Sequence, residues 1–91
     1  MHMTLSSCFS RILVDPRVSI YHIGTYLALV LLWDKNQQAN PVRVSRRRIM
    51  AITRTRSIAT YHKYIKELVC FGYIDYQPSY HPREGSRIWI K

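Results

Sequence analysis

The residues of this chain best suited to chemistry are basic ones gathered in a single stretch. Between Lys35 and Lys66 there are nine Lys or Arg residues and no Asp or Glu. Like charges at this density repel one another unless a polyanion neutralises them. The whole 91-residue chain has 14 basic and five acidic residues and a formal net charge of +9. Nucleic acid and anionic membrane are therefore the two partner classes to weigh first.

The other reactive side chains do not form a pattern typical of a catalytic or metal site. The four histidines lack partners at the spacing of zinc ligands, and Cys8 and Cys70 lie far apart. The five acidic residues are scattered, which does not indicate a catalytic carboxylate pair, and there is no Gly-rich phosphate-binding loop. We therefore predict no enzymatic activity, no metal and no cofactor, and no small-molecule ligand site is evident.

A membrane partner is not favoured either. The longest apolar run, residues 21–33, is shorter than the roughly 20 residues of a bilayer span, and polar residues interrupt it. The basic segment has one narrow apolar face, unlike the amphipathic helices that lie on membranes. The N-terminus lacks the pattern of an export signal, so we expect a cytoplasmic location with both cysteines reduced.

Apolar spacing predicts helices in the first half of the chain. In residues 4–14 an i, i+3, i+4, i+7 stripe predicts a short amphipathic helix that ends before Pro16. Residues 19–33 begin at a Ser19 cap and are apolar on nearly every face, which is typical of a central helix surrounded by other elements. The polar segment 37–41 should then form a loop.

Two further helices are predicted on either side of a polar break at residues 53–56. Ser45 would cap a helix of about two or three turns, and Ser57 would cap a longer one. Tyr61, Ile65 and Leu68 share one side of the longer helix, which predicts that they face the core. Gly72 stands where a left-handed residue commonly ends a helix.

After Gly72 the apolar period changes from helical to alternating, which predicts two strands. Ile74 and Tyr76 alternate with polar residues in the first strand, as do Ile88 and Ile90 in the second. The connection between them, PSYHPREGS, should be a hairpin loop. The same alternation assigns most aromatic residues of this region to packing and not to stacking on bases. We therefore predict one α+β, mainly α, domain over residues 1–91.

This order of elements is that of a winged helix-turn-helix, with three to four helices and a C-terminal β-hairpin wing. In that fold a recognition helix enters the major groove of DNA while a short helix braces it. We expect Thr60, His62 and Lys63 to contact bases, and the arginines of the short helix and the turn to contact phosphates. The predicted DNA-binding residues are Arg46, Arg47, Arg48, Arg54, Arg56, Ser57, Ala59, Thr60, His62, Lys63, Lys66, His81, Arg83 and Arg87.

The run TYHKYIKELVCFGYIDYQPSYHPREGSRIWI, residues 60–90, resembles a family of small winged-helix proteins of bacterial mobile elements, described as transcriptional regulators or excisionase-like proteins. The upstream segments HIGTYLALVLLW and VSRRRIM are also similar, so the resemblance covers residues 11 to 90. It implies a DNA-binding module. One departure is Thr55, which stands where an apolar residue is expected in the turn. The resemblance is carried by Thr60, Tyr61, His62, Lys63, Glu67, Leu68, Gly72, Tyr73, Ile74, Pro78, Ser79, Tyr80 and Gly85.

These features predict sequence-specific binding to double-stranded DNA by a transcriptional regulator. Two alternatives stay open: an architectural or excisionase-like factor in site-specific recombination, and a winged helix that docks an acidic protein without binding DNA. Charge alone does not separate DNA from RNA. Because proteins of this type often occupy paired half-sites, a homodimer is a compatible assembly.

Overall fold

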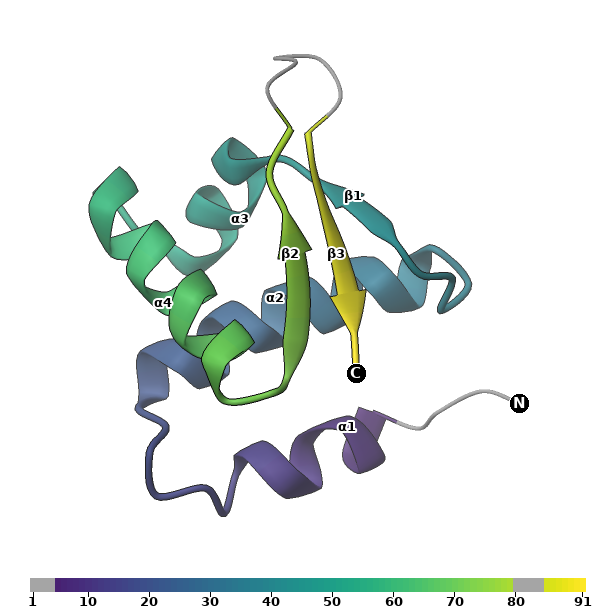
Figure 1. Ribbon diagram of the computed structural model, residues 1–91, viewed down its shortest axis with the longest axis vertical. Helices are drawn as coiled ribbons and strands as arrows, with labels where there is room; N and C mark the ends of the chain where they lie inside the picture. The colour runs from purple at the N-terminus through teal and green to yellow at the C-terminus, as the bar shows by residue number, and fades with distance from the viewer. Residues whose placement is uncertain (1–4, 80–84) are drawn as a thin grey trace.

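Four helices and a three-stranded antiparallel sheet make up the described part of the chain, residues 5–79 and 85–91 of a computed structural model (Figure 1). This arrangement is α+β and mainly helical, as predicted, and it is compatible with a winged helix. The elements follow in the order α1 (Leu5–Ile12), α2 (Ile20–Lys35), β1 (Val42–Val44), α3 (Arg46–Thr53), α4 (Ile58–Cys70), β2 (Ile74–Gln77) and β3 (Ser86–Ile90).

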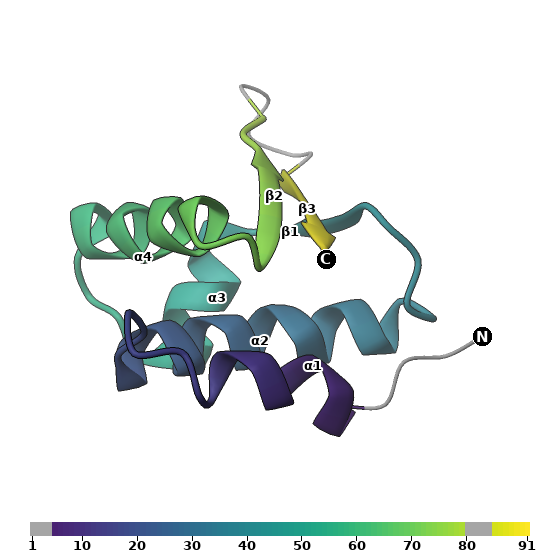
Figure 2. The same cartoon turned by 60° about the horizontal axis from the view of Figure 1, so that its bottom comes forward.

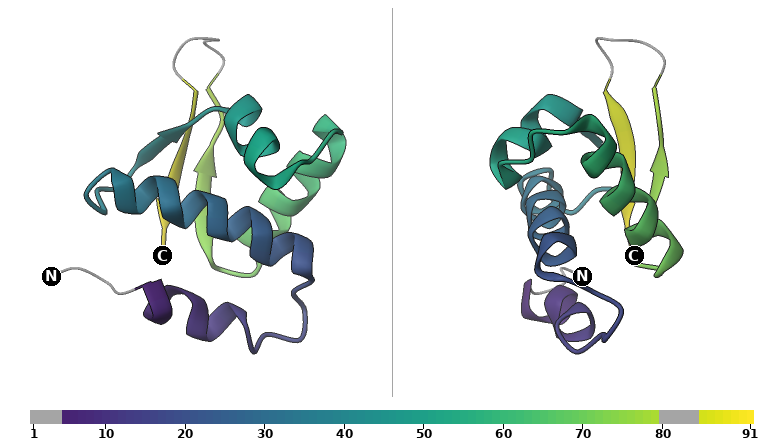
Figure 3. Two further views of the ribbon diagram at one scale, coloured as in Figure 1. Left: turned by 180° about the vertical axis from the view of Figure 1, so that it is seen from behind. Right: turned by 90° about the vertical axis from the view of Figure 1, so that its left-hand side faces the viewer.

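Helix α2 is the element around which the others pack. It runs between α1 on one side and α3, α4 and the sheet on the other (Figures 2 and 3). The backbone N–H of Ser19 donates to Nδ1 of His22 at 2.9 Å, which confirms the predicted start of the helix. The core of the molecule includes Tyr26, Leu29, Val30, Ile49, Ile65, Leu68, Ile74 and Ile88.

The prediction that α2 is surrounded on all sides is wrong. Part of the surface of the helix meets solvent. The apolar side chains exposed there are Ile20, Tyr21, Leu27 and Leu31.

The sheet has a third strand that the sequence did not predict. Its order is β1-β3-β2, and β1 pairs antiparallel with β3, with Val42 opposite Ile88. Strand β1 is only three residues long, with a buried, exposed, buried pattern, so its alternation is too short to stand out. Asn40 extends the pairing, because its side chain accepts from the Ile90 N–H at 3.0 Å and donates to the Ile90 carbonyl at 3.1 Å. The predicted two-stranded hairpin is therefore part of a three-stranded sheet.

Residues with positive φ end both α3 and α4. Gly72, with φ +87°, follows α4 as predicted, and the N–H of Tyr73 donates to the Leu68 carbonyl at 3.0 Å. At the end of α3 the left-handed position is held by Arg54, with φ 58°. An arginine there is strained relative to glycine, since its Cβ disfavours this conformation. The turn between α3 and α4 is therefore a backbone-strained segment.

A polar cluster attaches the loop before α2 to the turn after α4. The carboxylate of Asp15 accepts a hydrogen bond from the Tyr73 hydroxyl at 2.7 Å and pairs with Arg17, also at 2.7 Å. The guanidinium of Arg17 lies 4.6 Å from the centre of the Phe71 ring, and that of Arg11 lies 4.6 Å from the Tyr73 ring. The hydrogen bonds from Arg17 and Tyr73 hold the pKa of Asp15 well below its ordinary value of 3.8.

Gly85 should not tolerate a side chain, because its φ is +69° and an added Cβ would lie 2.8 Å from the carbonyl oxygen of Val44. We expect Gly85→Ala to lower the free energy of unfolding by about 2 kcal/mol in urea titrations. Gly24→Ala is the matched control: Gly24 lies inside α2, without positive φ and with no atom near its Cβ position. The free energy of unfolding of that variant should be about 0.5–1 kcal/mol higher than that of the wild type. Equal stability of the two variants would contradict the close approach of Gly85 to β1.

The lowered pKa of Asp15 predicts a loss of stability in acid. A carboxyl group whose pKa is lower in the folded than in the unfolded state stabilises the fold above its ordinary pKa, and the stabilisation is lost as pH falls below that value. We expect Asp15→Asn to lower the melting temperature at neutral pH and to weaken its decline between about pH 5 and pH 2. Asp75→Asn removes an exposed ion pair to Lys91 and serves as the control. A wild-type pH dependence in Asp15→Asn would exclude the proposed role of this carboxylate.

Candidate nucleic-acid interface

Three buried side chains determine which face of α4 meets solvent. Tyr61, Ile65 and Leu68 are 3%, 0% and 0% exposed, so their predicted position on the core side is confirmed. Burial raises the pKa of Tyr61 to about 12, although nearby Arg46 opposes the shift, and the phenol is therefore neutral at pH 7. The helix begins after Ser57, whose Oγ accepts a hydrogen bond from a backbone N–H of the first turn. Side chains on the opposite side of α4, such as Ala59 and Lys63, are exposed.

The predicted base-contacting residues do not all lie at the centre of that exposed side. Thr60 is half-buried and faces the start of α2. His62 is also half-buried, and its ring stacks on that of Tyr61 with a centroid distance of 5.2 Å. The predicted residues of α4 that are exposed are Ala59, Lys63 and Lys66. The charged residues among them are therefore lysines.

The predicted arginines of α3 and the α3–α4 turn are all exposed, but they point in different directions. Residues two apart on a helix are separated by about 200°, so Arg46 and Arg48 lie on opposite sides of α3. Arg46 is close enough to α4 to affect the pKa of Tyr61. Arg48 lines a groove of about 400 Å³ with Lys35 and Arg43, between the end of α2, β1 and the start of α3. The exposed arginines of this group are Arg46, Arg47, Arg48, Arg54 and Arg56.

Arg43 is a candidate phosphate-contacting residue that the sequence did not predict. It lies on β1 directly opposite Arg87 of β3, and both side chains are exposed. Like charges directly opposite each other destabilise a sheet, so a bound anion would stabilise this pair. Because β1 was not predicted, the sequence did not place Arg43 beside Arg87. The only sequence signal was the Val42-Arg43-Val44 alternation directly before the Ser45 cap.

The wing residues are described only in part. Arg87 is exposed on β3 and, with residues 77–79 and Gly85, borders a hollow of about 180 Å³. His81 and Arg83 lie outside the described residues. Arg87 therefore lies at the loop end of the β2–β3 hairpin, opposite Gln77.

In the part of the chain that the structure describes, no acidic side chain pairs with a basic residue of α3, the α3–α4 turn or α4. Among residues 5–79 and 85–91, the ion pairs join Asp15 to Arg17 and Asp75 to Lys91, and Glu67 contacts Nε2 of His22 at 3.3 Å. None of these pairs involves a basic residue of α3, the α3–α4 turn or α4. A positive potential therefore remains there, as electrostatic attraction of a polyanion requires.

Two kinds of site are absent from the part of the chain that the structure describes. It contains no group of three or more His, Cys, Asp or Glu side chains that could hold a metal ion. Within the same ranges, no helix has the length and apolar character needed to cross a bilayer. Comparison with protein-family models, curated proteins and solved structures gave no match.

Proposed function

We propose that this chain is a winged helix-turn-helix protein that binds double-stranded DNA sequence-specifically and regulates transcription. The observation that carries the proposal is that the basic residues of α3, the turn and the first half of α4, where the sequence has no acid, are all exposed. The order of elements from β1 to β3 supports it, because a short helix, a turn and a longer helix precede a β-hairpin. The resemblance of residues 11 to 90 to winged-helix proteins of mobile elements agrees with this assignment.

In the proposed complex α4 lies in the major groove, with its exposed side toward the base pairs. Lys63 extends from the middle of that side and would donate to guanine O6 and N7. Arg54 and Arg56 lie in the turn just before α4, where they would contact the flanking phosphates. Phosphate contacts would set the position and orientation of the protein, and α4 would supply the sequence preference.

The spread of basic residues beyond α4 favours a second candidate function, that of an architectural factor. The groove lined by Lys35, Arg43 and Arg48 lies on the side of α3 away from Arg46. A duplex that contacted α4 and this groove together would have to bend around α3. Gel mobility of permuted sites would separate this role from simple repression, since only a bent complex migrates according to the position of the site.

The proposed function predicts salt-dependent binding to a random-sequence duplex pool. About six to ten phosphate contacts would lower the affinity about 10³-fold to 10⁵-fold between about 50 and 200 mM salt. We expect sequencing of the retained duplexes to return an enriched motif. Salt-dependent binding without a motif would favour the architectural role. Absence of binding would overturn the DNA proposal and favour an acidic protein partner.

Arg47→Ala and Lys63→Ala should have different effects if α3 contacts phosphates and α4 reads bases. We expect Arg47→Ala to weaken binding to all sequences alike and to reduce the salt slope by about one unit. Lys63→Ala should cost about 1–3 kcal/mol at one base pair and relax the preference there. Lys91→Ala, at the end of the sheet remote from α3, is the control and should bind normally (Figure 1). A changed base preference in Arg47→Ala would indicate that Arg47 contacts bases. An equal loss of affinity for all sequences in Lys63→Ala would indicate that Lys63 contacts phosphates.

A further inference from the structure

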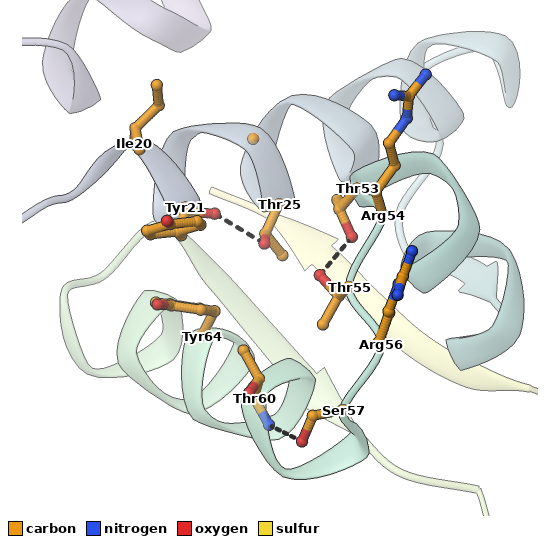
Figure 4. A pocket seen from close by; sticks show the side chains of 11 residues that line it. Ile20, Tyr21, Thr25, Thr53, Arg54, Thr55, Arg56, Ser57, Thr60 and Tyr64 are labelled. Atoms are coloured by element: carbon orange, nitrogen blue, oxygen red, sulfur yellow. Dashed lines mark hydrogen bonds between the residues drawn. The ribbon is translucent and has the colours of Figure 1, made fainter.

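A groove of about 640 Å³ opens between the start of α2 and the α3–α4 turn (Figure 4). Its walls come from the first turns of α2, from residues 53–57 and from the first half of α4. The volume lies within the range of small-molecule sites, which are mostly apolar with a few polar groups at defined positions. The groove thus has the size of a ligand site and adjoins the proposed DNA-binding surface.

Two small residues leave this groove open. Gly24 faces it, and no heavy atom lies within 4 Å of the position that a Cβ would occupy. A glycine inside a helix is unfavourable, and none of the described residues approaches Gly24 closely enough to require one. On the other wall, Thr55 stands where an apolar residue is expected, and its hydroxyl lies 2.8 Å from that of Thr53. Larger apolar residues at these two positions would fill the space.

The side of the groove where α2 meets α4 presents an aromatic surface. The rings of Tyr21 and Tyr64 stack with centroids 5.7 Å apart and an angle of 21° (Figure 4). Tyr21 is 65% exposed and neighbouring Ile20 is 75% exposed, so apolar surface is left uncovered beside the stack. Burial of this surface by a planar group would be favourable, since offset stacking adds to the hydrophobic gain.

The opposite wall is basic. Arg54 and Arg56 border the groove, both exposed, and none of the lining residues is acidic. A guanidinium binds a carboxylate or sulfonate through charge-assisted hydrogen bonds. The charge of the groove therefore complements a ligand with an anionic group on the side of the turn.

We propose that this groove binds a small molecule with a planar apolar body and one anionic group, such as an aryl carboxylate, and that this ligand weakens DNA binding. The body lies over Gly24 beside Tyr21 and Tyr64, and the anion lies at Arg54 and Arg56. Because the same arginines are proposed to contact DNA phosphates, ligand and DNA oppose each other, and the coupling is reciprocal. The effect on DNA rests on the proposed function, whereas ligand binding does not.

Fluorescence titration with anilinonaphthalene sulfonate tests the ligand site, and phenylnaphthylamine, the same body without the sulfonate, tests the anion contact. We expect the wild type to bind the sulfonate at least about tenfold more tightly than the neutral probe. In Gly24→Leu the added side chain fills the groove, and the affinity for both probes should fall at least about tenfold. Ser10→Leu places the same side chain on the exposed surface of α1 and should bind both probes as the wild type does.

The double variant Arg54→Gln, Arg56→Gln separates the anion contact from the apolar contact. It should bind the neutral probe normally and lose the preference for the sulfonate. Circular dichroism would verify that each variant is folded. We expect Gly24→Leu to fold, because Gly24 does not have a positive φ. Wild-type affinity of Gly24→Leu for the sulfonate would overturn the site, and an unchanged preference in the double variant would overturn the role of the arginines.

The coupling is measured by DNA binding with and without saturating sulfonate probe. We expect the probe to weaken DNA binding of the wild type by about tenfold and to leave Gly24→Leu unaffected. Equal DNA affinity of the wild type with and without probe would overturn the regulatory part. A wild type that binds the probe but no DNA would overturn the proposed function and the coupling, while the ligand site would stand.

Discussion

The fold depends on the burial of α2 at the centre of a small core. Helices α1, α3 and α4 and strands β1 and β3 all contact it, so α2 joins the helices to the sheet. The burial of α2 also affects where the charged side chains lie. Because the buried side of α2 holds no Lys or Arg, the lysines and arginines of a chain with net charge +9 lie outside the core, many of them on the outer faces of α3, α4 and the sheet. The surface that suits a polyanion is therefore a consequence of how the core is built.

Local interactions account for the parts of the fold that the sequence predicted. The caps at Ser45 and Ser57 satisfy backbone N–H groups within the first turn of each helix, and Gly72 is needed for a left-handed residue. Such signals act over three or four residues, so they are visible without a structure. The same holds for the exposure of Lys63 and Lys66, which follows from the helical period once the buried positions of α4 are known.

Features that depend on contacts distant in sequence were missed. Strand β1 forms because β3 lies beside it, and its three residues are too few for the alternation of apolar and polar side chains to predict a strand. Arg43 was overlooked for the same reason. The inward turn of Thr60 toward α2 and the uncovered face of α2 depend on how helices pack, which periodicity alone does not specify. The groove beside Gly24 is formed by three separate segments and had no sequence signature of its own.

Strand β1 has a mechanical consequence. It connects the loop after α2 to the first residue of α3, and its pairing with β3 joins that connection to the hairpin. Through β1, the position of the hairpin is therefore coupled to that of α3. Lengthening the connection between β2 and β3 would change the reach of the hairpin but leave its angle to α3 unaltered. In a set of related chains, the length of the β2–β3 connection would thus vary, whereas insertions within residues 42–44 would be rare.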